Sequence, residues 1–261
     1  MLELKSPSEI EEITLGGRII GALHDELEER VRPGVSTGDL DAFAEEFIRS
    51  HDGAVPIFKG LYGFPGAVCI SVNEEIVHGI PSSSRRLREG DIVTVDVGVK
   101  REGWCSDSAR TFRVGRVSSE TEQLLEVTRR ALEAAIAQAT PGNRVGDIGA
   151  AVMGTVEGTG FHIIRDLVGH GIGRKVHEDP QVPNLGRAGE GTPLHEGLVV
   201  AIEPMIAVGT DRIETLDDGW TVVTRDRSLS AHYEHTVAVT ADGPRVLTAT
   251  VEQAAGSGYN S

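Results

Sequence analysis

The stretch EGDIVTVD at residues 89–96 recurs 107 residues later as EGLVVAIE at residues 196–203. Upstream, PG at 33–34 followed by GDL at 38–40 recurs as PG at 141–142 followed by GDI at 146–148, an offset of 108. Each copy stands between two helical patterns, and an internal repeat decides architecture. The alternative is that common turn dipeptides recur by chance. We interpret the repeat as two related halves, with a central sheet backed by helices.

Local signals place the elements around this repeat. Ser6 can cap a helix, Pro7 suits the first helical position and Glu9 can complete a capping box. That helix should end before Arg32; a second is expected over 40–48, and the segment 67–80 reads as strand. We expect one catalytic domain spanning residues 1–261, with pseudo-symmetric halves of about 1–115 and 116–250 and a loose C-terminal tail at 251–261.

Composition excludes several classes of protein. The formal net charge of −15 argues against a broad or specific nucleic-acid surface, because phosphate binding needs clustered Lys and Arg. No apolar run reaches the length of about 18 residues that a membrane span needs, and the acidic N-terminus does not resemble a secretory signal. We therefore expect a soluble, cytoplasmic protein. Cys69 and Cys105 are too few for a disulfide scaffold, so both are expected to be reduced.

A carboxylate ends both copies of the repeated strand, Asp96 in the first and Glu203 in the second. Residues 100–103 read as a turn, and a turn centred on Arg101 and Glu102 would place Asp96 opposite Asp107. Opposed like charges destabilise a strand pair, and carboxylates about 4 Å apart repel by roughly 4 kcal/mol at an effective dielectric near 20. A positive charge is expected between them; a different register would leave both acids solvated.

Further metal-ligand types follow in the second half of the chain. GHGIG at 169–173 and VHEDP at 176–180 carry histidines that the glycines keep off a continuous helix. Taken singly, an Asp, Glu or His is more often a structural or surface residue. Taken together, four carboxylates and one imidazole form an oxygen-rich set of ligands that suits Mn, Fe(II), Co or Zn. Four carboxylates in one cleft would repel, and two divalent ions could neutralise them. The set is Asp96, Asp107, His170, Glu203 and Glu234.

Seven motifs resemble those of the type I methionine aminopeptidases, in the same order and over nearly the whole chain. They are SVNEEIVHGIP, VDVG, CSDSART, GHGIG, VHEDPQVPN, AIEPM and AHYEHTVAV. The resemblance implies an α/β (α+β) pita-bread fold with pseudo-twofold symmetry. Its curved central sheet would be antiparallel-rich and covered by helices, with a dinuclear metal site at the centre. It implies two divalent metal ions per chain (Mn, Fe(II), Co or Zn), bridged by Asp107 and Glu234, with Asp96 on one ion and His170 and Glu203 on the other.

The activity implied is metal-dependent removal of the initiator methionine from nascent proteins and peptides with a small second residue. A metal-bridging hydroxide would attack the first peptide bond, since a metal ion can lower the pKa of water from about 15.7 toward roughly 7. Glu203 is expected to shuttle a proton. His78 and His177 match the family's two non-ligand histidines, one at the scissile amide and the other at the substrate carbonyl and developing oxyanion.

A methionine side chain needs an apolar, polarizable pocket. Four residues are candidates by position, although ordinary core packing is the alternative for each: Tyr62, Phe64, Cys69 and Trp220. The sequence departs from the common family pattern at Phe58 and Leu61, where smaller thiol and aromatic residues are often seen, and at Val176, where an aromatic often precedes the histidine. These departures affect the expected pocket shape and leave the metal ligands unchanged.

Three alternatives make different predictions. An X-Pro aminopeptidase or prolidase resembles this fold and metal set but usually carries an N-terminal domain, for which we expect no room here. Type II methionine aminopeptidases carry a helical insertion, whereas only 25 residues separate His177 from Glu203 and 30 separate Glu203 from Glu234. A non-catalytic binding module would lose ligands that this chain keeps. We expect a monomer, with any transient ribosome contact coming from the domain surface because the segment before Ser6 is short.

Overall fold

The structure is a computed structural model, and it describes residues 2–249. The tail predicted at 251–261 lies outside the described residues. The helices within them are α1 (Pro7–Arg30), α2 (Thr37–Arg49), α3 (Ser119–Ile136) and α4 (Val145–Val156), with a short 3-10 helix η1 at Leu61–Gly63.

The strands are short apart from one long hairpin, and every pairing of named strands in the described residues is antiparallel. In chain order they are β1 (Ala54–Pro56), β2 (Cys69–Val72), β3 (Glu75–Val77), β4 (Ile92–Arg101), β5 (Trp104–Arg113), β6 (His162–Ile163), β7 (Val168–Gly171), β8 (Glu178–Pro183), β9 (Val199–Ile202), β10 (Met205–Ala207), β11 (Ile213–Thr215), β12 (Val222–Thr224), β13 (Ser230–His232), β14 (His235–Thr240) and β15 (Gly243–Val246).

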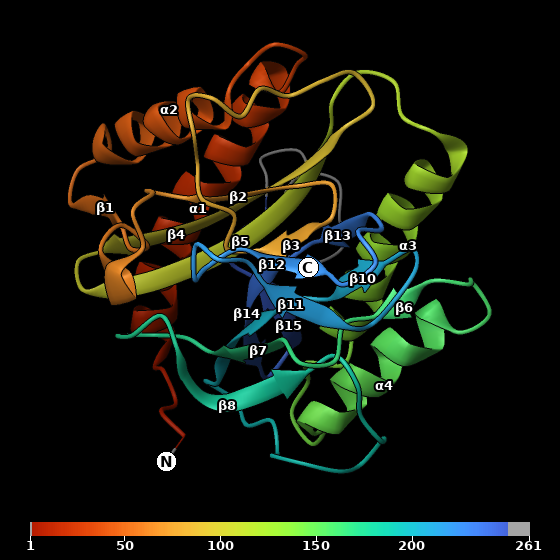
Figure 1. Cartoon of the computed structure of the whole chain (residues 1–261). Coiled ribbons are helices and arrows are strands. Elements are labelled where there is room, and N and C mark those ends of the chain that lie inside the picture. The colour runs from red at the N-terminus through yellow and green to blue at the C-terminus, as the bar shows by residue number, and fades with distance from the viewer. Residues whose placement is uncertain (1, 250–261) are drawn as a thin grey trace.

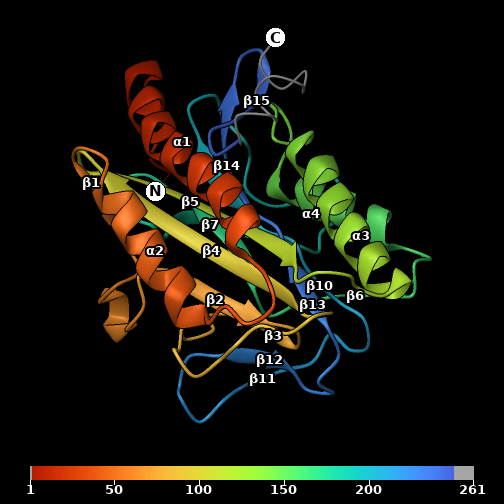
Figure 2. The ribbon, with the colours of Figure 1, turned by 90° about the horizontal axis from the view of Figure 1, so that it is seen from above.

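The strands lie at the centre of the molecule, and the helices lie around them (Figure 1). One sheet has the order β1-β4-β2 with β5 also paired to β4, and a five-stranded sheet has the order β15-β14-β9-β7-β8. Helix α1 lies over β4 and β5, and α2 lies beside α1 against β1 and β2, while α3 and α4 lie beside each other (Figure 2). The predicted fold class, an antiparallel-rich sheet covered by helices, is confirmed.

Helix α1 shows how closely the helices sit on the strands. It begins as predicted, with Pro7 in the first turn and a capping box between Ser6 and Glu9. Its Gly17 lies so close to the backbone at Leu247 that a Cβ on residue 17 would stand 2.2 Å from Leu247 O. Ser106 Oγ on β5 donates to Ile13 O at 2.6 Å. Because side chains alternate in direction along a strand, Ser106 points toward helix α1 and its neighbour Asp107 points to the opposite face of the sheet.

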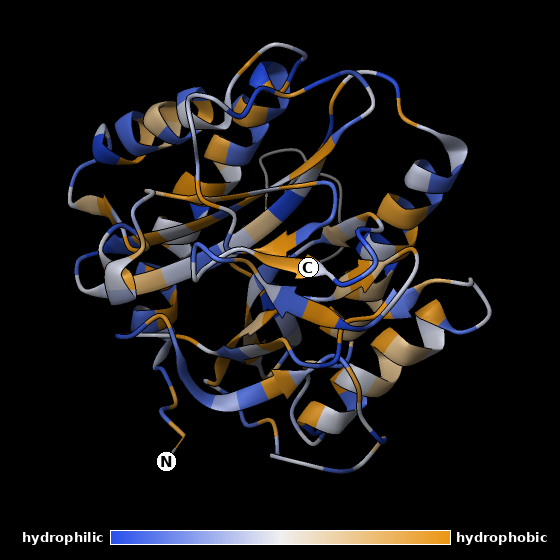
Figure 3. Cartoon of the chain, viewed as in Figure 1, coloured by the Kyte–Doolittle hydropathy of each residue, from blue (hydrophilic) through white to orange (hydrophobic). Residues whose placement is uncertain are grey.

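Two hydrophobic clusters lie beneath the two helix pairs, one containing Ile20, Leu23 and Val95, the other containing Leu124, Ile148 and Val200. Full burial of one such aliphatic side chain contributes roughly 1.5–3 kcal/mol. Figure 3 shows the corresponding hydrophobic bands along the helices and central strands, with hydrophilic residues between them. The two clusters are consistent with a two-part core, although the exact division near residue 115 stays a prediction.

The sequence repeat recurs as repeated backbone geometry. Gly34 and Gly142 adopt φ values of +92° and +96°, which favour glycine. After each, a carboxylate caps the helix that follows: Asp39 accepts from Ser36 N at 3.1 Å and Asp147 from Arg144 N at 2.7 Å. Isolated β-bridges join Ser36 to Arg86 and Arg144 to Pro193, again about 107 residues apart. The repeat is therefore structural and not a chance recurrence of turn dipeptides.

The predicted register of the β4–β5 hairpin is wrong. Arg101 pairs with Trp104, so the two-residue turn is Glu102-Gly103, and Asp96 stands opposite Ala109 instead of Asp107. The reason is turn chemistry: Glu102 and Gly103 have φ of +49° and +85°, and a two-residue turn with both φ positive matches the strand twist. Asp107 stands opposite Gly98, two residues from Asp96, so both acids still face the same side of the sheet.

Candidate metal centre

Five side chains predicted as metal ligands converge on one cavity from four places in the fold. Asp96 and Asp107 come from the middle of β4 and β5, and His170 comes from β7. Glu203 directly follows β9 and Glu234 directly precedes β14. All five line a cavity of about 800 Å³. The carboxylates of both copies of the repeat thus reach the site, although Asp96 lies within β4 and only Glu203 stands at a strand end.

The ligand atoms lie close enough to surround cations. One ligand atom from each of Asp107, His170 and Glu234 lies within 4.8 Å of the other two. His170 Nε2 is 3.6 Å from Glu203 Oε1. The Asp96 carboxylate lies near enough to Asp107 for its charge to help raise the pKa of Asp107. These spacings bring together a set of oxygens and one imidazole nitrogen of the kind that divalent ions bind.

The electrostatics of the carboxylates favour a bound cation. Burial raises the pKa of Asp96 to about 7. Burial, followed by repulsion from neighbouring carboxylates, raises the pKa of Asp107, Glu203 and Glu234 well above their usual values. Among the described residues, buried oxygens of Asp96, Asp107 and Glu234 have no hydrogen-bond partner. A buried oxygen without a hydrogen-bond partner costs free energy. Positive charge among these carboxylates would reduce their repulsion and also pair with the unpaired oxygens. The residues present therefore fit divalent metal ions.

His170 is prepared to act as a ligand. Its Nδ1 donates to Gly171 O at 3.0 Å, which leaves the lone pair on Nε2, the nitrogen that faces Glu203. Burial, and then the nearby His177, lower the pKa of His170 to about 4. The ring is therefore neutral at pH 7, the form that binds metal ions.

The comparisons with known proteins agree with this geometry. Residues 11–241 match the model of metallopeptidase family M24. The chain is 53% identical over 248 residues to a methionine aminopeptidase of Clostridium perfringens, covering 95% of this chain and 99% of the relative. A solved methionine aminopeptidase from Thermotoga maritima superimposes with a TM-score of 0.93 at 43% identity, covering 95% of this chain and 100% of the other.

The chain belongs to metallopeptidase family M24. Two relatives that match over nearly their full length, from Clostridium perfringens and Bacillus subtilis, are methionine aminopeptidases. A prolidase from Pyrococcus furiosus also superimposes, with a TM-score of 0.78 over 95% of this chain, but it is 24% identical and only 65% of it is covered. That likeness shows a shared fold alone. Membership of a metallopeptidase family and the clustered ligands together support the use of divalent metal ions.

His78 and His177, the histidines matched to the non-ligand pair of the M24 relatives, stand at the wall of the same cavity. The His177 ring lies 4.6 Å from that of His170, edge to face, and 6.3 Å from that of Tyr62, stacked. Burial lowers the pKa of His177, and burial with His177 nearby lowers that of His78. Both are therefore predominantly neutral at pH 7, so each can donate from one ring nitrogen and accept at the other.

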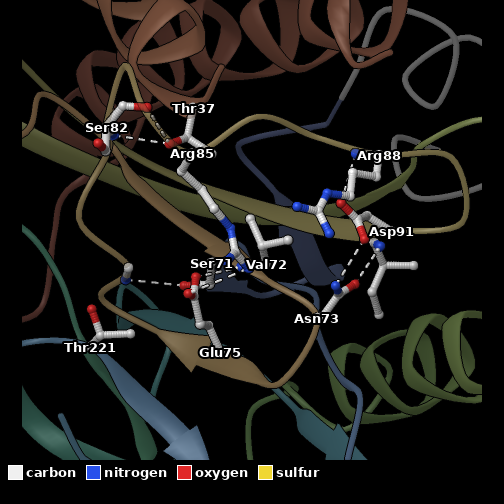
Figure 4. A network of polar contacts seen from close by, with 12 residues as sticks. Thr37, Ser71, Val72, Asn73, Glu75, Ser82, Arg85, Arg88, Asp91 and Thr221 are labelled. Carbon is white, nitrogen blue, oxygen red and sulfur yellow. Dashed lines mark hydrogen bonds and ion pairs between the residues drawn. The ribbon is translucent and has the colours of Figure 1, made fainter. Parts of the chain in front are cut away.

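The segment that carries His78 is held on both sides by polar contacts (Figure 4). Glu75 accepts from Val72 N at 2.7 Å, and Asn73 Nδ2 donates to Asp91 at 2.9 Å. His78 itself has φ of +60°, an uncommon backbone conformation for a residue with a side chain. Following it, Gly79 N donates to Ser71 Oγ at 3.1 Å. These bonds keep the imidazole at the cavity wall.

The four pocket candidates of this M24 member all line the cavity. Phe64 is buried and meets Trp220 edge to face at 5.2 Å, while the Tyr62 side chain is 77% exposed. Cys69 stands opposite Asp96; burial and then Asp96 raise the pKa of its thiol, so it is an apolar wall group. Cys69 and Cys105 are both free, as predicted.

The three departures from the common family pattern fall into two groups. Phe58 and Leu61 line the cavity, so their side chains form part of its wall. Val176 belongs to a hydrophobic core cluster and is absent from the cavity lining given by the described residues. An altered pocket shape at the first two positions stays a prediction.

Met205 and His232 are among the residues that line the cavity but were not singled out from the sequence. They stand opposite each other on β10 and β13. A signal for His232 was present, because it lies two residues before Glu234 and alternation along extended chain directs such residues to one side. Met205 follows Glu203 by the same spacing. Both sit in short strands whose pairing the sequence did not predict.

Proposed function

We propose that this chain is a methionyl aminopeptidase, a metal-dependent hydrolase that removes the initiator methionine from nascent proteins and peptides. The observation that carries the proposal is the convergence of four carboxylates and one neutral imidazole in a single cavity of a chain 53% identical, over 95% of its length, to a methionine aminopeptidase. Neither part would suffice alone, since family membership does not place ligands and a carboxylate cluster does not name a substrate.

Asp96, Asp107, His170, Glu203 and Glu234 would hold two divalent ions, with Mn, Fe(II), Co or Zn as the metals suited to this donor set. Asp107 and Glu234, at the centre of the cluster and 3% and 2% exposed, would bridge them. When bound, the metals supply positive charge that neutralises the carboxylates and makes water acidic enough to give hydroxide near neutral pH.

The remaining site residues would bind substrate and move protons. His177, neutral and stacked against Tyr62, can donate a hydrogen bond to the oxygen that becomes negative when the first peptide bond is attacked. His78, which lines the same cavity, can contact the scissile amide. Glu203, itself one of the proposed ligands, has one oxygen toward His170, and it can also carry a proton toward the leaving amine.

Substrate choice would follow from the cavity walls. Phe64, Cys69 and Trp220 supply apolar surface for an unbranched thioether side chain, and Tyr62 lies at the exposed margin. Peptides with a small second residue such as Ala, Gly or Ser should be preferred over those with Leu. The chain would act as a monomer in the cytoplasm on nascent peptides, with any ribosome contact made by its surface. Over the described residues, no helix is long and apolar enough to cross a membrane.

The test is release of free methionine from a Met-Ala-Ser peptide by metal-stripped protein titrated with Mn, Co, Fe(II) and Zn. Met-Leu-Ser and an X-Pro peptide run beside it, with an Asp107→Asn variant and an exposed-carboxylate control, Glu120→Gln. We expect metal-restored cleavage of Met-Ala-Ser that Asp107→Asn abolishes and Glu120→Gln retains. Cleavage of the X-Pro peptide instead would move the assignment to a prolidase; equal rates on both Met peptides would overturn the second-residue preference.

A further inference from the structure

His232 is a buried imidazole beside the metal ligands that none of the roles above uses. It is the last residue of β13, is 1% exposed and lines the cavity. Both of its ring nitrogens lack a hydrogen-bond partner among the described residues. A buried donor left unpaired costs about 1–3 kcal/mol. A buried ring of this kind therefore indicates a partner close by.

An acceptor close to this ring is the carboxylate of Glu203. His232 Nε2 lies 3.8 Å from Glu203 Oε2, while Oε1 of the same carboxylate lies 3.6 Å from His170 Nε2. The carboxylate is thus flanked by an imidazole at each oxygen. A gap of 3.8 Å is too short for a bridging water, which needs roughly 5 Å, but a shift of about 0.9 Å gives a direct hydrogen bond.

The backbones of both residues are anchored, so a change in side-chain torsion alone would close the gap. Thr111 Oγ1 accepts from His232 N at 3.0 Å and donates to His232 O at 2.7 Å. On the other side, Asn184 Nδ2 donates to Glu203 O at 3.0 Å. Because neither backbone is free to move, the imidazole and the carboxylate are held facing each other.

We propose that His232 is a positioning residue that donates from Nε2 to Glu203 Oε2 and keeps Oε1 directed toward His170. This arrangement lets His170 and Glu203 bind the same ion, and it prevents rotation of the carboxylate away from it. Hydrogen bonds from outside the ligand set commonly orient ligating carboxylates in this way. The proposal rests on the proposed function, because it needs Glu203 to be a metal ligand.

Two variants separate a donor role from simple packing. His232→Gln keeps a neutral N–H donor on a side chain of similar reach, and His232→Leu fills the space without a donor. Binding of Mn²⁺ to each metal-stripped protein is measured by calorimetry without any peptide. We expect His232→Leu to weaken binding of one ion by about 10–100-fold, and His232→Gln to bind close to the parent. Parent-like affinity in His232→Leu would overturn the proposal.

Loss of affinity in His232→Gln equal to that in His232→Leu would also overturn it, because the imidazole would then itself be a ligand. His24→Leu is the matched control: His24 is 2% exposed and contacts Val95 O at 3.3 Å, outside the metal cavity. It should leave Mn²⁺ affinity unchanged, and urea unfolding shows that each variant folds.

Methionine release is measured on the same samples. We expect His232→Leu to lower kcat with little change in KM, since none of the proposed substrate-binding residues is changed. A parent that binds Mn²⁺ without releasing methionine would refute the aminopeptidase function and leave the effect of His232 on metal affinity readable. The two proposals can thus fail separately.

Discussion

Lys5 Nζ donates to Glu178 Oε2 at 2.6 Å, and the two side chains are 3% and 7% exposed. Glu178 also accepts from Lys175 N at 3.0 Å, and it follows His177 directly in the chain. Lys5 N in turn donates to Gly197 O at 2.7 Å. The segment before α1 is therefore tied to the loop that presents a proposed substrate-binding histidine.

Breaking this ion pair should affect both stability and turnover. Lys5→Met leaves a buried carboxylate without its cation, which typically destabilises a protein by about 3–5 kcal/mol. Because the loop at His177 loses its anchor, kcat should fall more than 10-fold with Mn²⁺ affinity preserved. Urea unfolding and methionine release measure the two effects. The double variant Lys5→Met/Glu178→Gln removes the orphaned charge, so recovery of most of the lost stability is expected; no recovery would show that the ion pair is not the cause.

Tyr62 should matter for substrate binding and little for folding. Its side chain is 77% exposed, so Tyr62→Ala should change the free energy of unfolding by less than about 0.5 kcal/mol. Its ring stacks on His177, and its loss should raise KM for Met-Ala-Ser severalfold. The contrast is Phe64→Ala, a buried neighbour that should cost about 3 kcal/mol of stability. A Tyr62→Ala enzyme with unchanged steady-state kinetics would remove this residue from the pocket.

The sequence predicted the parts of the fold that local chemistry determines. The start of α1 follows from Ser6, Pro7 and Glu9, whose side chains satisfy the helix terminus without help from the rest of the protein. The repeated strand ending in Asp96 and Glu203 was visible because the same turn and hydrophobic run occur twice. The five ligands converge on one cavity; which ion each would hold is still a prediction.

Features that depend on pairing between distant segments could not be predicted. His232 faces Glu203 because β13 pairs with β10, and two three-residue strands give almost no sequence signal. Similarly, the Lys5–Glu178 ion pair joins residues 173 apart. The predicted hairpin register was wrong for a local reason. A turn at Arg101-Glu102 and a turn at Glu102-Gly103 both keep the same alternation of side chains between the two faces, and only the backbone conformation of Glu102 decides between them.

The turn residue Glu102 offers a test of that register. It adopts φ of +49° at the first central position of the turn, where Asn is strongly preferred. Glu102→Asn should therefore stabilise the protein by about 0.5 kcal/mol. Urea unfolding measures the change, and Glu120→Asn on α3 is the control, expected to stabilise nothing. A destabilised Glu102→Asn variant would contradict the assigned turn.

Metal binding should change how stability depends on pH. The folded pKa of Asp96 is raised from 3.8 to about 7, and those of Asp107, Glu203 and Glu234 are raised well above their usual values. In each case the folded protein holds a proton that the unfolded chain releases. The stability contributed by that proton is complete below the unfolded pKa and is lost as pH rises through the folded pKa.

The metal-free protein should consequently become less stable as the pH rises above about 6.5. The buried histidines His24, His170, His232 and His235 have folded pKa values lowered from 6.5, so they act in the opposite direction only up to about pH 6.5, and above it the carboxylates determine the trend. With saturating Mn²⁺ the carboxylates are already ionised and paired, and the decline should disappear or reverse, since protons no longer compete with the metal. Urea unfolding at several pH values, with chelator or Mn²⁺, compares the two forms. Without metal, the stability of Asp107→Asn should decline less steeply with pH than that of the parent. A metal-free parent whose stability is flat above pH 6.5 would show that the carboxylate cluster is not the source of the pH dependence.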